Sequence, residues 1–252
     1  MFHATLDSTK IWKQIVDSLA TLLTDAHLVV SEKGIELHQL DSSKAAMVNL
    51  DLPKSVFQEY VCEGEHDVCL GIDELVKVSK RMAGDDRLEF DLKDNRFEIK
   101  MLGQAERRFN LVLFDVPEAR SKSPSLKHDT KAEMFTDSFK QAVKDIGVVS
   151  NHIKIAATSD TIVFRGDGDS GEVEVSLKKG DDESALFDLE VGGDSQARYS
   201  LSYLSEIVKA MSGDSVKLHF SSDKPIVIEF GIAEKGRISF VLAPIVEQRW
   251  EK

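Results

Sequence analysis

Alternating apolar and polar side chains run through much of this chain and predict β-strands. The clearest case is residues 34–40, where Ile35, Leu37 and Gln39 would face one side of a sheet and Glu36, His38 and Leu40 the other. Asp41-Ser42-Ser43 then supplies turn residues, and a second strand is expected from Ala45 to Leu52, ended by Pro53. The same period of two recurs at residues 88–92, 173–177 and 226–230.

Four short segments follow a helical period instead. Their apolar residues recur every three or four positions, which places them on one face of a helix. The expected stripes are Ile11, Ile15, Leu19 and Leu22; Leu75, Val78 and Met82; Phe139, Val143 and Ile146; and Leu204, Ile207, Val208 and Met211. We expect each helix to bury its stripe against a sheet.

The chain also repeats itself weakly at about half its length. Residues 13–16 (Lys-Gln-Ile-Val) return as residues 140–143 (Lys-Gln-Ala-Val), 127 positions later. His27-Leu28-Val29-Val30 returns as His152-Ile153-Lys154-Ile155, and residues 75–80 correspond to residues 204–209. Each half therefore has the same order of elements: strand, helix, strands, helix, strands.

These patterns predict an α+β fold of two similar domains, each an antiparallel sheet structure with two helices. We place the N-terminal domain at residues 1–115 and the C-terminal domain at residues 131–252. The connector between them is residues 116–130, where Pro117, Pro124 and several Ser and Lys residues interrupt any periodicity.

Composition narrows the class of protein. The chain has 252 residues, 42% of them hydrophobic and 30% charged, as expected for a globular protein without a membrane span or a signal peptide. Cys62 and Cys69 are too few for a disulfide framework and favour a reducing cytosolic or nuclear setting. The net charge of −12 argues against nucleic-acid binding unless the basic residues are gathered on one surface.

No motif for catalysis or for a metal stands out. Gly166-Asp167-Gly168-Asp169-Ser170-Gly171 resembles the start of a calcium loop, but Lys178 occupies the position where such a loop needs glutamate. We interpret this segment as a turn between strands whose glycines supply positive φ angles. No Walker A loop, metalloprotease helix or nucleophile elbow occurs. We expect no catalytic residues, no metal and no cofactor.

The expected helices carry a stronger signal, because cations recur on them at spacings of three and four. The residues are Lys10 and Lys13 on the first helix, Lys77, Lys80 and Arg81 on the second, Lys140 and Lys144 on the third, and Lys209 on the fourth. On one helix such lysines usually mean only a solvated face. Their recurrence at matching positions, Lys13 with Lys140 and Lys80 with Lys209, favours a shared basic face.

Three segments resemble one known family. Asp41-Ser42-Ser43 followed by a strand that ends in Leu50-Asp51-Leu52-Pro53, the tail Ser239 to Glu247 with Leu242-Ala243-Pro244, and the start Met1-Phe2-His3-Ala4 are similar to proliferating cell nuclear antigen, the sliding clamp of archaeal and eukaryotic replication. The resemblance covers nearly the whole chain. It implies a trimeric ring that encircles duplex DNA without reading its sequence, with the eight helix cations facing the duplex.

The resemblance also implies partners and surfaces. Partners would be DNA polymerase, a clamp loader ATPase, flap endonuclease and DNA ligase, which bind through short peptide motifs. The partner-peptide pocket, expected between the two halves, would consist of Leu40, Met47, Leu126, Pro225, Val241, Ala243 and Pro244. Val241 stands where many relatives have an aromatic residue, which would make the pocket shallower. The subunit interface would join Phe109, Leu111 and Leu113 to Val173, Val175 and Leu177 of the next copy.

Two alternatives stay open from the sequence. One is a checkpoint-type clamp subunit, which shares the fold but works in a heterotrimer. The other is a small acidic α+β enzyme whose active site is assembled from distant residues. The expected location is the cytoplasm or nucleoid in an archaeon and the nucleus in a eukaryote. The sequence does not distinguish a homotrimer from a heterotrimer.

Overall fold

The protein is described from a computed structural model that places residues 1–116, 121–180, 184–193 and 195–246. By its internal contacts the chain divides into two units. The first contains Met1–Ser123 together with Gly231–Ile238, and the second contains Pro124–Phe230 together with the residues from Ser239 onward. This division differs from two consecutive domains, because the short segment Gly231–Ile238 from the second half joins the first unit. The domain boundaries predicted from the sequence, at residues 115 and 131, stay a prediction.

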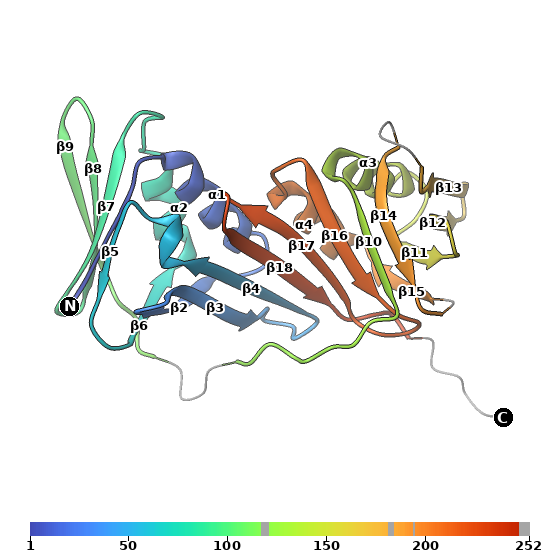
Figure 1. The fold of residues 1–252 in the computed structure, drawn as a ribbon, viewed down its shortest axis with the longest axis horizontal. Coiled ribbons are helices and arrows are strands. Elements are labelled where there is room, and N and C mark those ends of the chain that lie inside the picture. Colours follow the sequence, from blue (N-terminus) through green and yellow to red (C-terminus); the bar gives the residue numbers. More distant parts are fainter. Residues whose placement is uncertain (117–120, 181–183, 194, 247–252) are drawn as a thin grey trace. The chain divides into compact units, whose positions relative to one another are not determined.

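Residues of the first half form nine strands and two α-helices (Figure 1). The strands are β1 (Phe2–Leu6), β2 (Asp25–Ser31), β3 (Gly34–Leu40), β4 (Ala46–Pro53), β5 (Glu59–Cys62), β6 (His66–Gly71), β7 (Arg87–Lys93), β8 (Arg96–Leu102) and β9 (Glu106–Val112). The helices are α1 (Thr9–Ala20) and α2 (Ile72–Ser79), with a short 3₁₀ turn η1 (Lys54–Val56).

The second half repeats the order of strands and α-helices among the described residues, without a counterpart of η1. Its strands are β10 (Thr130–Phe135), β11 (His152–Ala157), β12 (Thr161–Gly168), β13 (Gly171–Lys178), β14 (Leu186–Val191), β15 (Ser195–Ser200), β16 (Ser215–Phe220), β17 (Ile226–Ile232) and β18 (Gly236–Leu242). Its helices are α3 (Thr136–Ile146) and α4 (Leu201–Ala210). The predicted α+β fold with two helices in each half is confirmed.

Strand order repeats as well as element order. In the first half the neighbours are β5-β1-β7-β8-β9 and β4-β3-β2-β6, and in the second they are β14-β10-β16-β17-β18 and β13-β12-β11-β15. Ladders are antiparallel, as in the pairing of β3 with β4 and of β12 with β13. In each half the two helices pack on one another, α1 on α2 and α3 on α4. The weak sequence repeat therefore corresponds to a structural duplication.

Local sequence explains where these elements begin and which face they bury. The Ser8 hydroxyl caps α1 by accepting a hydrogen bond from the Lys10 amide. In β3 the side chains of Ile35 and Leu37 are buried and that of Leu40 is exposed, as the alternation predicted. The predicted stripes of α3 and α4 are buried throughout.

The stripe predicted for α1 is partly wrong. Ile11 and Leu22 are only half-buried, whereas Trp12 and Val16 are buried together with Ile15 and Leu19. Trp12 sets the face because its ring packs against Phe90 and Phe97, with ring centroids 4.6 and 6.4 Å away. A large aromatic side chain buries more apolar area than isoleucine, so the buried face is shifted toward Trp12 and Val16 while Ile15 and Leu19 stay on it.

The glycine-rich segment at residues 166–171 is the predicted turn between β12 and β13, but two of its glycines serve another purpose. Only Gly171 has a positive φ, +143°. A Cβ on Gly166 would lie 2.3 Å from Ile146 Cγ2, and one on Gly168 would lie 2.0 Å from the Val149 carbonyl oxygen. These glycines let the end of α3 approach β12 closely.

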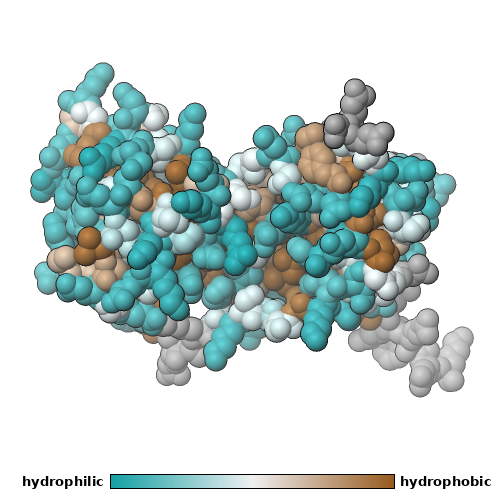
Figure 2. Space-filling view, viewed as in Figure 1, coloured by the Kyte–Doolittle hydropathy of each residue, from teal (hydrophilic) through white to brown (hydrophobic). Residues whose placement is uncertain are grey.

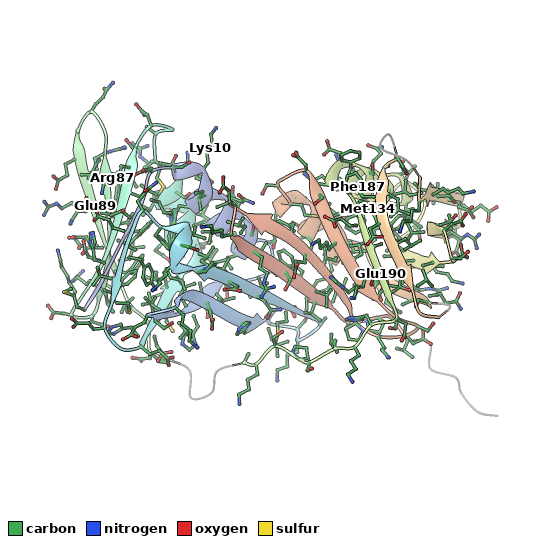
Figure 3. All side chains as sticks on the ribbon, in the orientation of Figure 1. Lys10, Arg87, Glu89, Met134, Phe187 and Glu190 are labelled. Atoms are coloured by element: carbon green, nitrogen blue, oxygen red, sulfur yellow. The ribbon has the colours of Figure 1, made fainter. Side chains whose placement is uncertain are left out.

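The outer face of the sheet β5-β1-β7-β8-β9 holds a compact ionic cluster, whose Glu89 is labelled in Figure 3. Lys100 Nζ lies 3.0 Å from Asp91, 3.4 Å from Glu89 and 3.5 Å from Glu98. His3 Nδ1 lies 2.9 Å from Asp91. Only 17% of the Lys100 side chain is exposed, and it contacts all three of these largely desolvated carboxylates, whereas Lys93 pairs with Glu98 alone at 2.8 Å.

The cluster shifts the pKa values of its members. Burial by itself raises the pKa of Asp91, but hydrogen bonds from His3 and Lys100 outweigh it and the pKa is lowered. The pKa of Glu98 is lowered mainly by its hydrogen bond from Lys93, and the pKa of Lys100 is raised mainly by Asp91. The lowered acids stabilise the fold above about pH 4, and the raised lysine does so below about pH 10. The cluster is therefore stabilising between these limits.

We predict that Lys100→Met lowers the free energy of unfolding by about 1–3 kcal/mol at neutral pH, because it leaves three carboxylates close together. Protonation relieves their repulsion, so the loss shrinks as the pH falls toward about 4. Urea denaturation at fixed protein concentration measures both effects. Lys93→Met is the matched control, since Lys93 is 57% exposed and should contribute less than about 1 kcal/mol. Equal losses in the two variants would contradict the assigned role of Lys100.

Candidate nucleic-acid interface and partner surfaces

The cations of α1 lie on the side of the helix opposite its buried face. Lys10 is exposed and extends away from the helix in Figure 3, and Lys13 is half-buried. Lys13 Nζ donates a hydrogen bond of 3.0 Å to the Met82 carbonyl in the turn after α2. This bond links α1 to the turn that follows α2.

The cations predicted for α2 are all exposed, but only one lies within the helix. Lys77 is in its last turn, Lys80 is the C-cap residue, and Arg81 lies in the turn beyond. The helix ends at Ser79, earlier than the spacing predicted. The Arg81 carbonyl accepts a 2.7 Å hydrogen bond from Arg107, the second residue of β9, which fixes this turn. Cations at the helix C-terminus also interact favourably with its dipole.

In the second unit, Lys140 is half-buried and Lys144 is exposed on α3, while Lys209 is exposed in the last turn of α4. Lys209 Nζ lies 2.7 Å from Glu206 Oε1 one turn earlier. Part of its charge is thus offset within its own helix, which the spacing of the cations does not reveal. Such an exposed ion pair contributes little to stability, so Lys209 can readily leave Glu206 for another anion.

Acidic residues share these outward faces. The helices and the two residues after α2 carry the eight predicted cations but also six acids, namely Asp17, Asp73, Glu74, Asp137, Asp145 and Glu206. The outward helix faces are therefore only weakly positive, in a chain whose net charge is −12. Figure 2 shows that hydrophilic side chains cover most of the visible surface of each unit. The four helices and the two residues after α2 together therefore carry a small net positive charge, whereas the chain as a whole is strongly negative.

The strands predicted to form the subunit interface both stand at the end of their strand order. β9 is the last strand of the sheet β5-β1-β7-β8-β9, and β13 is the first strand of a different sheet, β13-β12-β11-β15. In each strand exposed and half-buried residues alternate. The half-buried positions include the predicted apolar residues Phe109, Leu111, Val173, Val175 and Leu177. Leu113 lies just after β9, where its amide donates to the Asn95 carbonyl at 3.2 Å. Each edge thus combines one apolar row with one polar row.

The residues predicted to bind partner peptides fall in both units and differ in exposure. In the first unit Leu40 is 39% exposed, but Met47, directly opposite it on β4, is only 6% exposed. In the second unit Val241 is buried, Leu126, Pro225 and Pro244 are half-buried, and Ala243 is exposed. Met47 and Val241 are core residues of this chain taken alone. A partner contact at any of the seven stays a prediction.

Two features of the second unit were not found from the sequence. His128 Nε2 donates a 2.9 Å hydrogen bond to the Pro225 carbonyl, and the Asp129 amide donates to Ser221 Oγ at 2.8 Å, so the end of the connector is fixed to this unit. The Ile245 amide donates to the Arg198 carbonyl at 2.7 Å, which holds the segment after Pro244 against β15. No sequence motif marks these bonds, because each joins residues more than 40 positions apart.

Within the described residues, no group of three His, Cys, Asp or Glu side chains is placed to hold a metal ion. Of the described helices, none combines the length and apolar character that crossing a membrane requires. Cys62 and Cys69 are both free thiols.

Comparison with known proteins agrees with this architecture. Profiles of the proliferating cell nuclear antigen N-terminal and C-terminal domains match residues 1–117 and 122–245. The DNA polymerase sliding clamp of Pyrococcus horikoshii is 34% identical over 249 residues, covering 98% of this chain and 99% of the relative. That of Thermofilum pendens is 34% identical over 240 residues, covering 94% and 96%.

Among solved structures, the crystal structure of PCNA from Thermococcus kodakaraensis is similar to this chain with a TM-score of 0.92. The two are 28% identical, and the match covers 97% of this chain and 100% of that one. The duplicated fold, the two domain profiles and the relatives matched over their whole length lead to one conclusion: the chain belongs to the proliferating cell nuclear antigen family.

Proposed function

We propose that this chain is a DNA sliding clamp, a ring of three copies that encircles duplex DNA and holds DNA polymerase on its template as a non-enzymatic processivity factor. The observation that carries the proposal is that β9 and β13, two of the strands that end a sheet, each present an open edge with an apolar row. An unpaired edge invites another strand, and head-to-tail pairing of two different edges closes into a ring when the rotation between copies permits it.

The duplication supports the pairing of these two edges. By element order, β9 corresponds to β18 and β13 corresponds to β4. Within the first unit, the beginning of β18 lies beside β4, where Arg237 donates to Asp51 Oδ2 at 3.1 Å. A Cβ on Gly236 would come within 2.9 Å of Leu52 Cδ2. Pairing of β9 with β13 of the next copy would repeat a contact that the chain already makes.

The helix faces fit a track for DNA. Lysine and arginine side chains that contact only phosphates read no sequence and allow the protein to slide. Because the outward faces are only weakly positive, a closed ring would retain DNA by topology rather than by affinity, and the acidic remainder of the surface would repel it. We assign the eight helix cations to this role.

Further partners follow from the family. We propose that a clamp loader ATPase, flap endonuclease and DNA ligase bind as polymerase does, each through a short peptide that contacts the predicted pocket residues of both units. Membership in the family favours this function over the small acidic enzyme. The second candidate function is a checkpoint-type clamp subunit, which works in a heterotrimer. The two candidates differ in whether the purified chain assembles into a trimer without other chains.

We predict that the purified chain forms a homotrimer at micromolar concentration, with a mass three times the 28.1 kDa of one chain by light scattering. Val175→Lys should release folded monomers, because it puts a charge into the apolar row of the β13 edge. Ser176→Lys, on the exposed row of the same strand, is the control and should remain trimeric. A parent that stays monomeric would contradict the homotrimer and favour a heterotrimer with other chains.

We predict that reversing Lys13, Lys80, Lys140 and Lys209 to Glu leaves the trimer intact but lowers polymerase stimulation on a primed circular template by at least about tenfold. The affinity of the variant for linear duplex should also depend less on salt, since fewer phosphates are neutralised.

The matched control changes the net charge equally at exposed lysines outside the helices, namely Lys33, Lys54, Lys131 and Lys235. It should stimulate polymerase nearly as well as the parent. Equal losses in the two quadruple variants would show that overall charge, rather than the helix face, controls DNA binding.

We predict that a peptide with a Gln, an aliphatic anchor and two aromatic residues binds the parent, and that Leu40→Asp weakens it at least about tenfold. Leu40 is preferable to Met47 for this test because its side chain is exposed, so the fold should tolerate the change. Val61→Asp, at a similarly exposed apolar residue of the first unit, is the control. Unaltered affinity in a trimeric Leu40→Asp variant would remove Leu40 from the partner surface.

A further inference from the structure

Three cations stand side by side on the solvent face of the sheet β13-β12-β11-β15. Lys154 on β11 is directly opposite Arg165 on β12 and directly opposite Arg198 on β15. All three point away from the core, because their neighbours on the other face, including Ile153, Ile155 and Phe164, are fully buried. We call Arg165, Lys154 and Arg198 the cationic row.

Like charges directly opposite one another destabilise a sheet. Arg165 is relieved by Glu174 on β13, whose Oε2 lies 2.5 Å from Arg165 Nε. Lys154 is half-buried between the two arginines, and among the described residues nothing forms a hydrogen bond or ion pair with its ammonium group. The centre of the row is therefore a partly desolvated cation that lacks an anion.

The duplication shows that the fold does not require cations here. His27-Leu28-Val29-Val30 corresponds to His152-Ile153-Lys154-Ile155, so Val29 is the equivalent of Lys154. Val29 is directly opposite Glu36 on β3 and Asp67 on β6. The corresponding positions of the first half thus hold two acids, Glu36 and Asp67, on either side of Val29. This agrees with the negative net charge of the chain. The reversal of charge is specific to the second half.

Two hollows flank the row and share Lys154 and Arg198. One, of about 730 Å³, reaches from the row toward Asp167, Glu172 and Glu174 on the β13 side. The other, of about 290 Å³, is bounded by Gln196, Asp223, Ile245 and Val246. Ile245 and Val246 are 41% and 61% exposed, so the second hollow has an apolar wall beside its cations.

The second hollow adjoins the predicted peptide-binding residues of the same unit. Ile245 follows Pro244, and Asp223 is two positions before Pro225. We propose that the cationic row is a second docking element for partner proteins, which binds an acidic segment flanking the peptide that contacts Pro225, Ala243 and Pro244. This inference rests on the proposed partner surface. The occupant is an acidic peptide with an aliphatic residue for Ile245 and Val246.

Charge and dimensions favour a peptide over nucleic acid. The row spans three adjacent strands, roughly 10 Å, which is enough for one or two carboxylates but short for tracking a phosphate backbone. Acidic side chains at Asp167, Glu172 and Asp223 border the same hollows and would repel a polyanion. A few carboxylates can pair with Lys154 while avoiding these acids.

The test uses fluorescein-labelled peptides in anisotropy titrations. The core peptide carries a Gln, an aliphatic anchor and two aromatic residues, and its derivatives add four Glu or four Gln at either end. For one of the two ends we expect the Glu form to bind the parent about 3- to 10-fold more tightly than the Gln form at low salt. The difference should nearly vanish at about 0.5 M salt.

Lys154→Glu should abolish this difference while core-peptide affinity stays unchanged. The variant should also gain thermal stability, a Tm rise of about 2 °C, because it removes the opposition of like charges. Lys217→Glu, on β16 of the same unit, should keep the parent's preference for the Glu form. A parent without that preference, or a Lys154→Glu variant that retains it, would overturn the proposal.

The design separates this inference from the proposed function. If the core peptide does not bind the parent, the partner surface is what fails, and an octapeptide of glutamate then tests the row alone. It should raise the Tm of the parent at millimolar concentration and not that of Lys154→Glu, and equal effects would overturn the proposal. A labelled 20-base-pair duplex is titrated in parallel. Lower duplex affinity in Lys154→Glu, without a Glu preference in the parent, would assign the row to nucleic acid instead.

Discussion

A strand at the end of a sheet leaves one row of backbone N–H and C=O groups without a strand partner, and the proposed ring depends on two such rows. β9 and β13 are both regular and partly apolar, and neither contains the proline that commonly protects an edge, although each carries charged residues such as Arg108 and Glu174. Exposed in a monomer, edges of this kind would lead to aggregation. In the proposed assembly, head-to-tail pairing between copies would satisfy these hydrogen bonds and determine the symmetry of the ring.

Duplication makes that solution accessible, because the chain needs only one kind of edge contact. The elements equivalent to β9 and β13 are β18 and β4, and the start of β18 already lies beside β4 within the first unit. In the proposed ring, the helices would need no strong affinity for DNA. Their outward faces carry eight cations and six acids, a balance that suits sliding better than tight binding.

Much of this could be predicted from the sequence, because periodicity reflects which side of an element is buried. Alternation correctly identified β3, β7, β13 and β17, and the helical stripes of α3 and α4 are buried as predicted. The prediction was wrong where tertiary contacts decide between similar residues. Trp12 replaced Ile11 on the buried face of α1 because Phe90 and Phe97, which are 78 and 85 positions away in the sequence, provide its packing partners.

The candidate surfaces were harder to predict for the same reason. The sequence identifies an apolar residue but does not say whether its neighbours cover it: Leu40 and Met47 are paired across β3 and β4, yet one is exposed and the other buried. Likewise, a count of lysines does not reveal that Lys209 lies beside Glu206. Whether an apolar residue is covered and whether a lysine is paired both depend on cross-strand or helical neighbours. These neighbours can be identified only once the fold is known.

The two halves show how one scaffold acquires different surfaces. On the first, Lys100 is enclosed by Glu89, Asp91 and Glu98, so the charges are satisfied internally and serve stability. On the second, Lys154 lies between Arg165 and Arg198, an arrangement that opposes stability. Natural sequences tolerate such local conflicts mainly where function requires them. Because the fold is duplicated, Val29 and Lys154 occupy equivalent backbone positions, and the difference in charge between them comes from the residues alone. The proposed external anion would therefore bind only the second half of the chain.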